Sequence, residues 1–575
     1  MAAKKKTTNK TAEETGVAPI ISSLDQGKAE GLYFLPLGGV GGFGLNCSLY
    51  YSHGEWLMVD LGLGFADDSL PGVEIVLPDL SFIAARHQKL VGLVLTHAHE
   101  DHIGAVPYLW HHLKCPIYGS AFTLEMVRQK LVEHKMLDAV PLKLIDTAGY
   151  HDIGGFSVQM VGVTHSIPET RLLSIRTPYG TVVHTGDWKL DDTPVVGAVS
   201  EVEAIKAIAS DKVLALVGDS TNALTEGWSG SEGTLLPHFT RIFEQSPQRV
   251  AVACFSSNVA RLTTVAQAAR EAGRSVGLVG RSLWRIADAA RRCGYLADFP
   301  EFLTERQAAQ LPSEKLVLMC TGSQGEPRAA LPRIAQDEHP DISLDDGDVV
   351  IFSARTIPGN EKNIYSMQNQ LLRHGIKVIT DGDDTVHVSG HPQREEMRQL
   401  YRWLQPQLLL PVHGEFAHLE AHAKLAKECG VAQTLIPENG QIIRLDGNEA
   451  HVVAEIDLHI QAVDGDMVLP FNHASIRARR RLSEEGAVVA SLALNRKGGL
   501  VGQVHIAAPG LLSAEEDKKM HEQIIAQITD KIDAVAIEEL RSDDVMREHV
   551  RLIIRRFFQQ KKGKRPLIDV HLIRV

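Results

Sequence analysis

Residues 93–102 read Leu93-Val94-Leu95-Thr96-His97-Ala98-His99-Glu100-Asp101-His102. The aliphatic start of this stretch predicts a buried strand. Three histidines and an aspartate follow within six positions, and imidazole and carboxylate groups are ligands that zinc and manganese accept. His97 and His99 can face one ion, while Asp101 and His102 turn toward a second. We therefore predict a metal site here, in preference to a polar loop of solvated histidines.

The length of the chain predicts several domains. With 575 residues it is too long for one hydrophobic core, and we expect about three or four domains. Its composition, 44% hydrophobic and 23% charged, is typical of a soluble globular protein. No apolar run reaches the length of about 18 residues that predicts a membrane span. Residues 1–27 contain lysines and threonines but no apolar core, so we expect a disordered tail, no secretory signal and a cytoplasmic location.

The cysteines and the charge exclude some classes of site. The six cysteines lie far apart and form no C-x-x-C pair, so neither a disulfide framework nor a thiolate zinc site is indicated. The formal net charge of −12 argues mildly against a nonspecific polyanion binder. A local groove can still be basic, and bound metal ions add positive charge where a phosphate would lie.

Two further strands each run into a possible metal ligand. Residues 158–163 lead to His165, and residues 181–183 lead to Asp187. Either one alone is weak, because a histidine or aspartate after a strand is commonly a turn residue. Together, after the histidine loop, they supply a third histidine and a carboxylate that could bridge two ions.

The start of the chain contains a glycine turn and another strand-end carboxylate. Gly39, Gly41 and Gly44 formally make a G-x-G-x-x-G, the dinucleotide-binding pattern. That interpretation needs a helix next, whereas residues 47–51 look like a strand, so we favour a tight turn in a hairpin. Asp60 is the carboxylate at the end of the buried strand predicted within residues 56–62, and we expect it to orient the metal-binding loop.

The order of these residues resembles the metallo-β-lactamase superfamily, an αββα sandwich with a two-metal site at one edge of its sheets. Two later segments, Val386-His387-Val388-Ser389-Gly390-His391 and Leu410-Pro411-Val412-His413-Gly414-Glu415, resemble the late histidine motifs of the β-CASP nucleases. Within that group the chain is most similar to the bacterial ribonuclease J family. Further similar segments are residues 38–46, 218–222, 255–258, 320–327 and 357–361. Gly42 departs from the pattern, because an acidic residue is expected there, and this puts a role of the glycine turn in question.

The resemblance implies an α/β fold: a metallo-β-lactamase sandwich with an inserted β-CASP α/β domain and a small C-terminal α+β domain. The expected boundaries are a tail at 1–27, the sandwich at 28–228 and 387–453, the insertion at 229–386, a linker at 454–481 and the C-terminal domain at 482–575. In that last domain two helices with apolar residues at helical spacing, Ile524 to Val535 and Val550 to Phe557, are expected to face its core. By resemblance this domain makes a homodimer or homotetramer.

The resemblance also implies a two-metal site, with zinc as the expected metal and manganese as the alternative. His97, His99 and His165 would bind one ion, Asp101, His102 and His413 the other, and Asp187 would bridge them. Asp101 would also position the nucleophile. A proton for the leaving 3′ oxygen would come from His387 or His391, and these histidines, with Ser389 and Gly390, would bind an RNA phosphate. Asp219 resembles an acidic motif at the entry to the insertion and is expected to support the site.

These residues together predict a ribonuclease that acts on single-stranded RNA as an endonuclease and as a 5′-to-3′ exonuclease, in RNA maturation and decay. A 5′-monophosphate end is the expected preference. The alternatives are a β-CASP DNA-repair nuclease, a small-molecule metallohydrolase of the same superfamily, and a noncatalytic RNA-binding scaffold. The basic run Lys561-Lys562-Gly563-Lys564-Arg565 fits either a nucleic-acid patch or a solvated linker.

Overall fold

The computed structural model describes residues 17–67, 69–145, 149–357, 359–447, 449–513, 517–534 and 542–575. The chain forms two compact units. The first comprises residues 1–64 and 77–459, and the second comprises residues 65–76 and 460–575.

An eight-stranded sheet forms one layer of the first unit, in the order β22-β21-β1-β2-β3-β6-β7-β8. Its strands are β1 Leu32–Gly38, β2 Cys47–Ser52, β3 Glu55–Val59, β6 Leu90–Val94, β7 Ile117–Gly119, β8 Leu142–Leu144, β21 Gln441–Arg444 and β22 His451–Glu455. Strands β3 and β6 pair in parallel. Their carboxyl ends therefore meet at one edge of the sheet, where Asp60 and the histidine loop follow them.

A seven-stranded sheet forms the facing layer, in the order β20-β19-β13-β12-β11-β10-β9. Its strands are β9 Tyr150–Ile153, β10 Phe156–Gly162, β11 Arg171–Thr177, β12 Gly180–His184, β13 Val213–Asp219, β19 Leu408–Val412 and β20 Gln433–Thr434. Strands β13 and β19 pair in parallel, with Asp219 opposite Val412. The chain between them leaves this sheet and returns to the adjacent position, which brings His413 to the end of β13.

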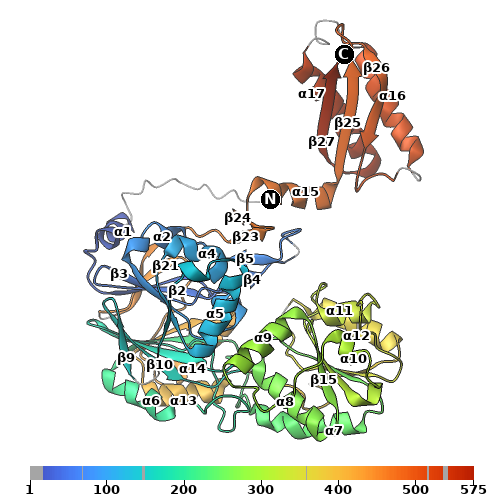
Figure 1. Ribbon diagram of the computed structural model, residues 1–575. Helices are drawn as coiled ribbons and strands as arrows, with labels where there is room; N and C mark the ends of the chain where they lie inside the picture. Colours follow the sequence, from blue (N-terminus) through green and yellow to red (C-terminus); the bar gives the residue numbers. More distant parts are fainter. Residues whose placement is uncertain are drawn as a thin grey trace. The chain divides into compact units, whose positions relative to one another are not determined.

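One hydrophobic core joins the inner faces of the two sheets, with Phe34, Leu57 and Val94 from the first and Val158 and Val217 from the second among its buried residues. Helices cover the outer faces (Figure 1). They are α2 Ser81–Ala84, α3 Glu100–Ile103, α4 Val106–Leu113 and α5 Ala121–Glu133 after strands of the first sheet, and α6 Val202–Ile208, α13 Arg394–Leu404 and α14 Phe416–Glu428 against the second. The predicted αββα sandwich is confirmed.

A separate parallel sheet forms the inserted part, in the order β15-β16-β14-β17-β18. Its strands are β14 Val250–Ala253, β15 Ser275–Val279, β16 Leu316–Cys320, β17 Val349–Phe352 and β18 Lys377–Ile379. Its helices are α7 Leu236–Gln245, α8 Val259–Glu271, α9 Arg281–Arg292, α10 Glu305–Ala308, α11 Ala330–Ala335 and α12 Glu361–Arg373. Figure 1 shows this group of helices around β15. Alternation of strand and helix along the chain explains the parallel sheet.

The second unit contains two small sheets. One has the order β26-β25-β27, from β25 Ala487–Leu494, β26 Leu500–Ala507 and β27 Leu567–Arg574. Helices α16 Lys518–Ala534 and α17 Asp543–Lys562 share a core with it; Val535 lies outside the described residues. The other sheet has the order β24-β23-β5-β4, from β4 Gly64–Phe65, β5 Ile75–Leu77, β23 Gln461–Asp464 and β24 Met467–Pro470. Helix α15 spans Ala474–Glu485.

Three sequence-based expectations differ from the structure. The tail of residues 1–27 was expected to be disordered, but α1 Val17–Gln26 is helical; residues 1–16 lie outside the described residues. The segment 454–481 was expected to be a linker, but it contains β23, β24 and the start of α15. Residues 65–76 were expected in the sandwich, but they belong to the second unit. Short strands that pair with distant segments leave no periodic signal, which explains the last two differences.

The glycine turn lies in a hairpin. Strands β1 and β2 pair antiparallel across it, which excludes the dinucleotide interpretation, because no helix follows the turn. Within the described ranges, no helix has both the length and the apolarity needed to cross a bilayer.

Candidate metal centre

The Asp60 carboxylate fixes the histidine loop after β6 through hydrogen bonds. This carboxylate accepts hydrogen bonds from the Thr96 backbone N–H at 2.8 Å, the Thr96 hydroxyl at 2.8 Å and His102 Nδ1 at 2.7 Å. Asp60 has a left-handed backbone conformation with φ of 60°, which is uncommon for a residue other than glycine. Because Nδ1 of His102 is engaged, Nε2 is the nitrogen that faces the other predicted ligands.

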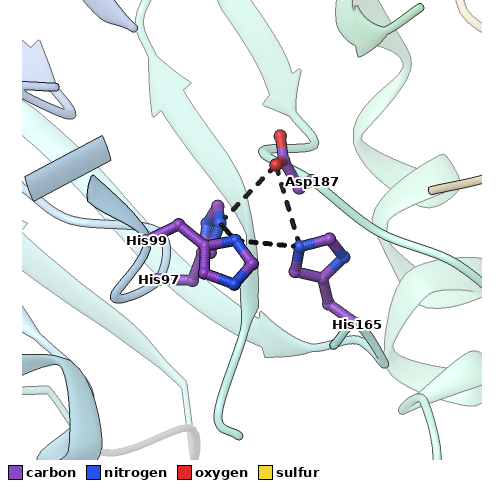
Figure 2. A group of neighbouring side chains, drawn as sticks. All are labelled: His97, His99, His165 and Asp187. Atoms are coloured by element: carbon purple, nitrogen blue, oxygen red, sulfur yellow. Dashed lines mark hydrogen bonds and ion pairs between the residues drawn. The ribbon is translucent and has the colours of Figure 1, made fainter. Parts of the chain in front are cut away.

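Four predicted ligands form a first cluster, shown in Figure 2. Their ligand atoms, from His97, His99, His165 and Asp187, all lie within 4.8 Å of one another. Nδ1 of His99 lies 3.1 Å from Nε2 of His97 and 3.2 Å from Nε2 of His165. Oδ2 of Asp187 lies 3.6 Å from His97 Nε2 and 3.8 Å from His165 Nε2. Three imidazoles and one carboxylate thus converge on one point.

A second cluster adjoins the first and contains Asp101, His102, Asp187 and His413, again within 4.8 Å. Nε2 of His102 lies 3.4 Å from Oδ2 of Asp101 and 3.3 Å from Oδ1 of Asp187. Nε2 of His413 lies 3.7 Å from Oδ2 of Asp101, and Nδ1 of the same ring lies 3.2 Å from Oδ1 of Asp187. The structure therefore brings together all seven predicted metal ligands.

Asp187 belongs to both clusters through different oxygens. Its Oδ2 faces the histidines of the first cluster, and its Oδ1 faces His102 and His413. Within the described residues, Oδ1 of Asp187 and Nδ1 of His413 are buried and make no hydrogen bond. Buried polar atoms without a hydrogen bond are costly. These two lie 3.2 Å from each other, within ion-pair distance but without a hydrogen bond, which fits a site completed by a cation.

Burial and neighbouring charges shift the pKa values of the histidines in the two clusters. Burial, with the neighbouring histidines, holds the pKa of His97 and His165 well below its ordinary value, and burial lowers the pKa of His99 to about 4. Burial also acts against protonation of His102, but the carboxylates of Asp187, Asp101 and Asp60 outweigh it and raise the pKa of His102. Neutral imidazoles and ionised carboxylates are the forms that bind metals.

The turn of residues 389–391 lies against the first cluster. His165 Nδ1 donates to the Gly390 carbonyl at 2.5 Å, and a side chain at Gly390 would collide with the His165 ring, 2.8 Å from its Cε1 atom. His391 Nδ1 donates to Asp219 Oδ2 at 2.9 Å. Asn222 Nδ2 donates to Ser389 Oγ at 2.8 Å and to the His391 carbonyl at 3.0 Å. Ser389, Gly390 and His391 are therefore fixed beside the metal ligands.

His387 lies apart from these contacts. It is close to the positive charges of Arg261, Arg355 and Lys189, and burial together with these charges lowers its pKa to about 3. Its Nδ1 is buried without a hydrogen-bond partner among the described residues. Of the two predicted proton donors, His391 is the one held next to the clusters, with its ring 5.0 Å from that of His165 and 5.6 Å from that of His413.

Comparison with known proteins assigns the chain to a family. It is 41% identical to ribonuclease J of Sinorhizobium meliloti over 556 residues, which cover 96% of this chain and 99% of the relative. The chain belongs to the ribonuclease J family. Ribonuclease J of Thermus thermophilus is 32% identical over 94% of this chain and 95% of its own length, and that of Helicobacter pylori is 32% identical over 93% and 78%.

Four family models match consecutive parts of the chain. They describe the metallo-beta-lactamase superfamily at residues 40–203, the ribonuclease J beta-CASP domain at 247–371, a Zn-dependent metallo-hydrolase RNA specificity domain at 375–437 and the ribonuclease J C-terminal domain at 474–575. Membership of the ribonuclease J family makes the chain a metal-dependent nuclease. The donor set of the two clusters, five imidazoles and two carboxylates, fits divalent metal ions.

Three polar residues at the site carried no assigned role at the sequence level. Asn46 Nδ2 lies 3.1 Å from both Asp101 Oδ2 and His102 Nε2. Asn222 holds the 389–391 turn, and Arg355 donates to its Oδ1. Asparagine is commonly a turn residue, so neither asparagine gave a signal of its own.

The glycine turn has a structural part in the ribonuclease J site despite Gly42. The His413 N–H donates to the Gly39 carbonyl at 2.7 Å, and Gly42 makes a backbone bridge to Gly414. These contacts place His413, whose φ of 57° is left-handed. They use backbone groups alone, so the missing acidic side chain does not disturb them.

Proposed function

We propose that this chain hydrolyses phosphodiester bonds of single-stranded RNA, both internally and from the 5′ end toward the 3′ end. The observation that carries the proposal is the pair of clusters that share Asp187, with the 389–391 turn beside them. A small-molecule metallohydrolase would need the clusters but not that turn. A noncatalytic scaffold would be expected to have lost ligands, whereas all seven are present here.

In this proposal the clusters hold two divalent ions, zinc or alternatively manganese. His97, His99 and His165 would hold one ion, Asp101, His102 and His413 would hold the other, and Asp187 would serve both. Metal bound there would supply a water of lowered pKa and positive charge to offset the charge that develops on the phosphate oxygens. Asp60 orients His102, and Asp219 orients His391. Both carboxylates act through these histidines and do not touch the reactants themselves.

The protein groups divide the remaining work. Asp101 orients the attacking water in line with the phosphorus. His391, held through Nδ1 by Asp219, presents its other nitrogen to the leaving 3′ oxygen and gives it a proton. Ser389, the Gly390 backbone, His387 and His391 hold an adjacent phosphate. A terminal 5′-monophosphate in this position would explain a preference for 5′-monophosphorylated RNA.

The proposal extends to the setting of the reaction. The enzyme works in the cytoplasm in RNA maturation and decay, as a homodimer or homotetramer formed through the second unit. A β-CASP nuclease that acts on DNA is the second candidate, because the clusters themselves do not distinguish ribose from deoxyribose.

Matched RNA and DNA strands, each 5′-labelled with a monophosphate, test the proposal. We expect hydrolysis of RNA only, with loss of at least about 100-fold in rate for His97→Ala, since removal of a ligand weakens the bound metal. His134→Ala is the control, because His134 is an exposed histidine at the end of α5 and belongs to neither cluster. Unchanged degradation of RNA by His97→Ala, or equal cleavage of DNA, would contradict the proposal.

A further inference from the structure

The second unit contains a cavity lined by arginines. Its volume is about 520 Å³, and its lining residues are Arg481, Arg555, Arg556, Gln559, Gln560 and Arg565. These residues come from α15, from α17 and from the segment between α17 and β27. None of them belongs to the metal clusters, and the lining contains no acidic residue.

The fold of the unit explains the cavity. Helix α17 buries Val550, Ile554 and Phe557 in the core, so the arginines and glutamines at 555, 556, 559 and 560 lie on its outer side. Gly563 ends the helix in a left-handed conformation with φ of 68°. The chain then returns, and Arg565 Nε donates to Gln559 Oε1 at 2.6 Å.

Helix α15 closes the other side of the cavity. Arg481, near its end, donates to the Arg565 carbonyl at 3.4 Å. The Arg565 backbone N–H donates to Glu485, and Lys564 Nζ donates to the Glu484 carbonyl. These contacts hold α15 and the return segment together and engage the guanidinium groups of Arg481 and Arg565, whereas those of Arg555 and Arg556 line the cavity without a partner of their own among the described residues.

The charges along α17 change where the cavity begins. In its first half, Arg547 pairs with Asp544 at 3.1 Å and Arg551 is paired with Glu548. From residue 555 to 565 there are six basic side chains and no acidic one. Within the described residues, neither Arg555 nor Arg556 makes an ion pair or a hydrogen bond through its side chain. The helix dipole favours basic side chains only within about the last turn of a helix. Arg555 and Arg556 lie more than one turn before Lys562, where α17 ends, so the dipole does not explain why they are basic.

We propose that this cavity is a second RNA-binding site, which holds the phosphodiester backbone of single-stranded RNA through residues other than those of the cleavage site. The proposal rests on the ribonuclease function above. Guanidinium groups present a planar fork of donors that matches phosphate oxygens, and the glutamine amides offer donors and acceptors for ribose hydroxyls. A cluster of positive charge in a chain of net charge −12 is complementary to a polyanion, and RNA is the polyanion that this enzyme meets.

Such a site acts by raising the effective concentration of a long substrate at the clusters. An RNA that reaches both sites would bind more tightly than one that fills the cleavage site alone. We therefore expect long RNA to bind more tightly than short oligonucleotides, which fill the cleavage site alone.

The double variant Arg555→Gln/Arg556→Gln tests the site in the full chain. Binding of a fluorescein-labelled 30-nucleotide RNA to metal-free protein, followed by anisotropy, is expected to weaken about 10-fold. For single strands the slope of log K against log salt is about −0.7 per phosphate contact, so loss of two contacts should reduce its magnitude by about 1.4. Hydrolysis of a 5-nucleotide RNA should keep its kcat/KM.

Arg547→Gln/Arg551→Gln on the same helix is the matched control, since these arginines have acidic partners. An equal loss of binding in the control, or an unchanged salt slope in Arg555→Gln/Arg556→Gln, overturns the proposal. So does a change in oligomeric state by light scattering, which would assign the arginines to contact between copies. Displacement of RNA by polyglutamate as effectively as by unlabelled RNA overturns it in favour of an acidic protein partner. If the wild type cleaves neither RNA, the proposed function fails, while the salt slope still decides the second site.

Discussion

Asp60 Oδ2 accepts a hydrogen bond from His102 Nδ1 at 2.7 Å, and Nε2 of the same ring lies 3.3 Å from Asp187 Oδ1. The ring thus joins a buried carboxylate behind the loop to the shared carboxylate of the clusters. Asp60 makes two more hydrogen bonds to Thr96, so one side chain fixes both the ring and the backbone before it.

Asp60→Asn should therefore weaken metal binding with little effect on the fold. An amide has one acceptor oxygen where the carboxylate has two, and its NH2 group faces one of the donors instead of accepting from it, so the three hydrogen bonds cannot all be kept and the His102 ring loses its fixed orientation. We expect metal affinity to fall about 10- to 100-fold, measured by titration with a competing chelator. Asp79→Asn, a buried carboxylate that binds two backbone N–H groups elsewhere, is the control and should leave metal affinity unchanged.

Removal of bound metal should abolish RNA hydrolysis and lower the melting temperature. Ligand that binds only the folded state stabilises it by about 2.7 kcal/mol at a concentration 100 times its Kd, and the buried Asp187 and His413 atoms lose their cation when it leaves. Differential scanning calorimetry before and after chelation, with zinc and manganese added back separately, measures the effect. A melting temperature that chelation does not change would contradict a resident metal at these residues.

Gly62→Ala should disrupt the histidine loop, whereas Gly42→Ala should be tolerated. A Cβ at Gly62 would lie 1.6 Å from the Asp101 carbonyl oxygen, whereas one at Gly42 meets nothing within 4 Å. We expect loss of metal binding and destabilisation of about 3 kcal/mol or more for Gly62→Ala, and a change within about 0.5 kcal/mol for Gly42→Ala. Thermal unfolding and metal content measure both; equal behaviour of the two variants would refute the proposed packing of Gly62 on the loop.

Arg261→Met should destabilise the inserted part strongly. Arg261 is fully buried and donates through Nε to Glu232 at 2.6 Å and through Nη1 to the Ser353 carbonyl at 2.7 Å. Its loss leaves the Glu232 carboxylate buried without a partner, at a cost of about 3 to 5 kcal/mol. The double variant Arg261→Met/Glu232→Gln should recover part of that cost in unfolding experiments. A double variant no more stable than Arg261→Met would show that the ion pair is not the source.

Asn222→Ala should slow cleavage through the 389–391 turn. The amide holds Ser389 and the His391 carbonyl, and hydrogen bonds of this kind contribute about 0.5 to 1.5 kcal/mol each. We expect kcat/KM for 5′-monophosphorylated RNA to fall about 10-fold with metal content unchanged. Gln433→Ala removes a similar two-bond amide contact to Ala450 and should leave kcat/KM as it is in the wild type.

The sequence predicted the part of the site that follows local patterns. An apolar strand that runs into several histidines identified His97, and two further strands that run into His165 and Asp187 identified these residues when taken together with the histidine loop. His413 lies 226 residues after Asp187 (413 − 187), so only the resemblance to a known family placed it. Its position follows from the pairing of β13 with β19, a contact between distant segments that local patterns do not encode.

The second unit shows more clearly what local sequence patterns fail to predict. Its segment 65–76 is distant from residues 460–575 in sequence, and two- to four-residue strands are too short to show alternation. In α15 the buried residue is Ile476, and four arginines lie between 477 and 481. A helix with so little apolar surface has no detectable period, which is why its segment resembles a linker at the level of sequence.

The adjacency of β13 and β19 also has a consequence for synthesis of the enzyme. Strand β19 cannot join the sheet until the whole inserted part has been translated. His413 is made only after about seven-tenths of the 575 residues. Until then the nascent chain has the His97 loop but an incomplete second cluster. A growing chain thus remains without the full set of ligand residues until late in translation.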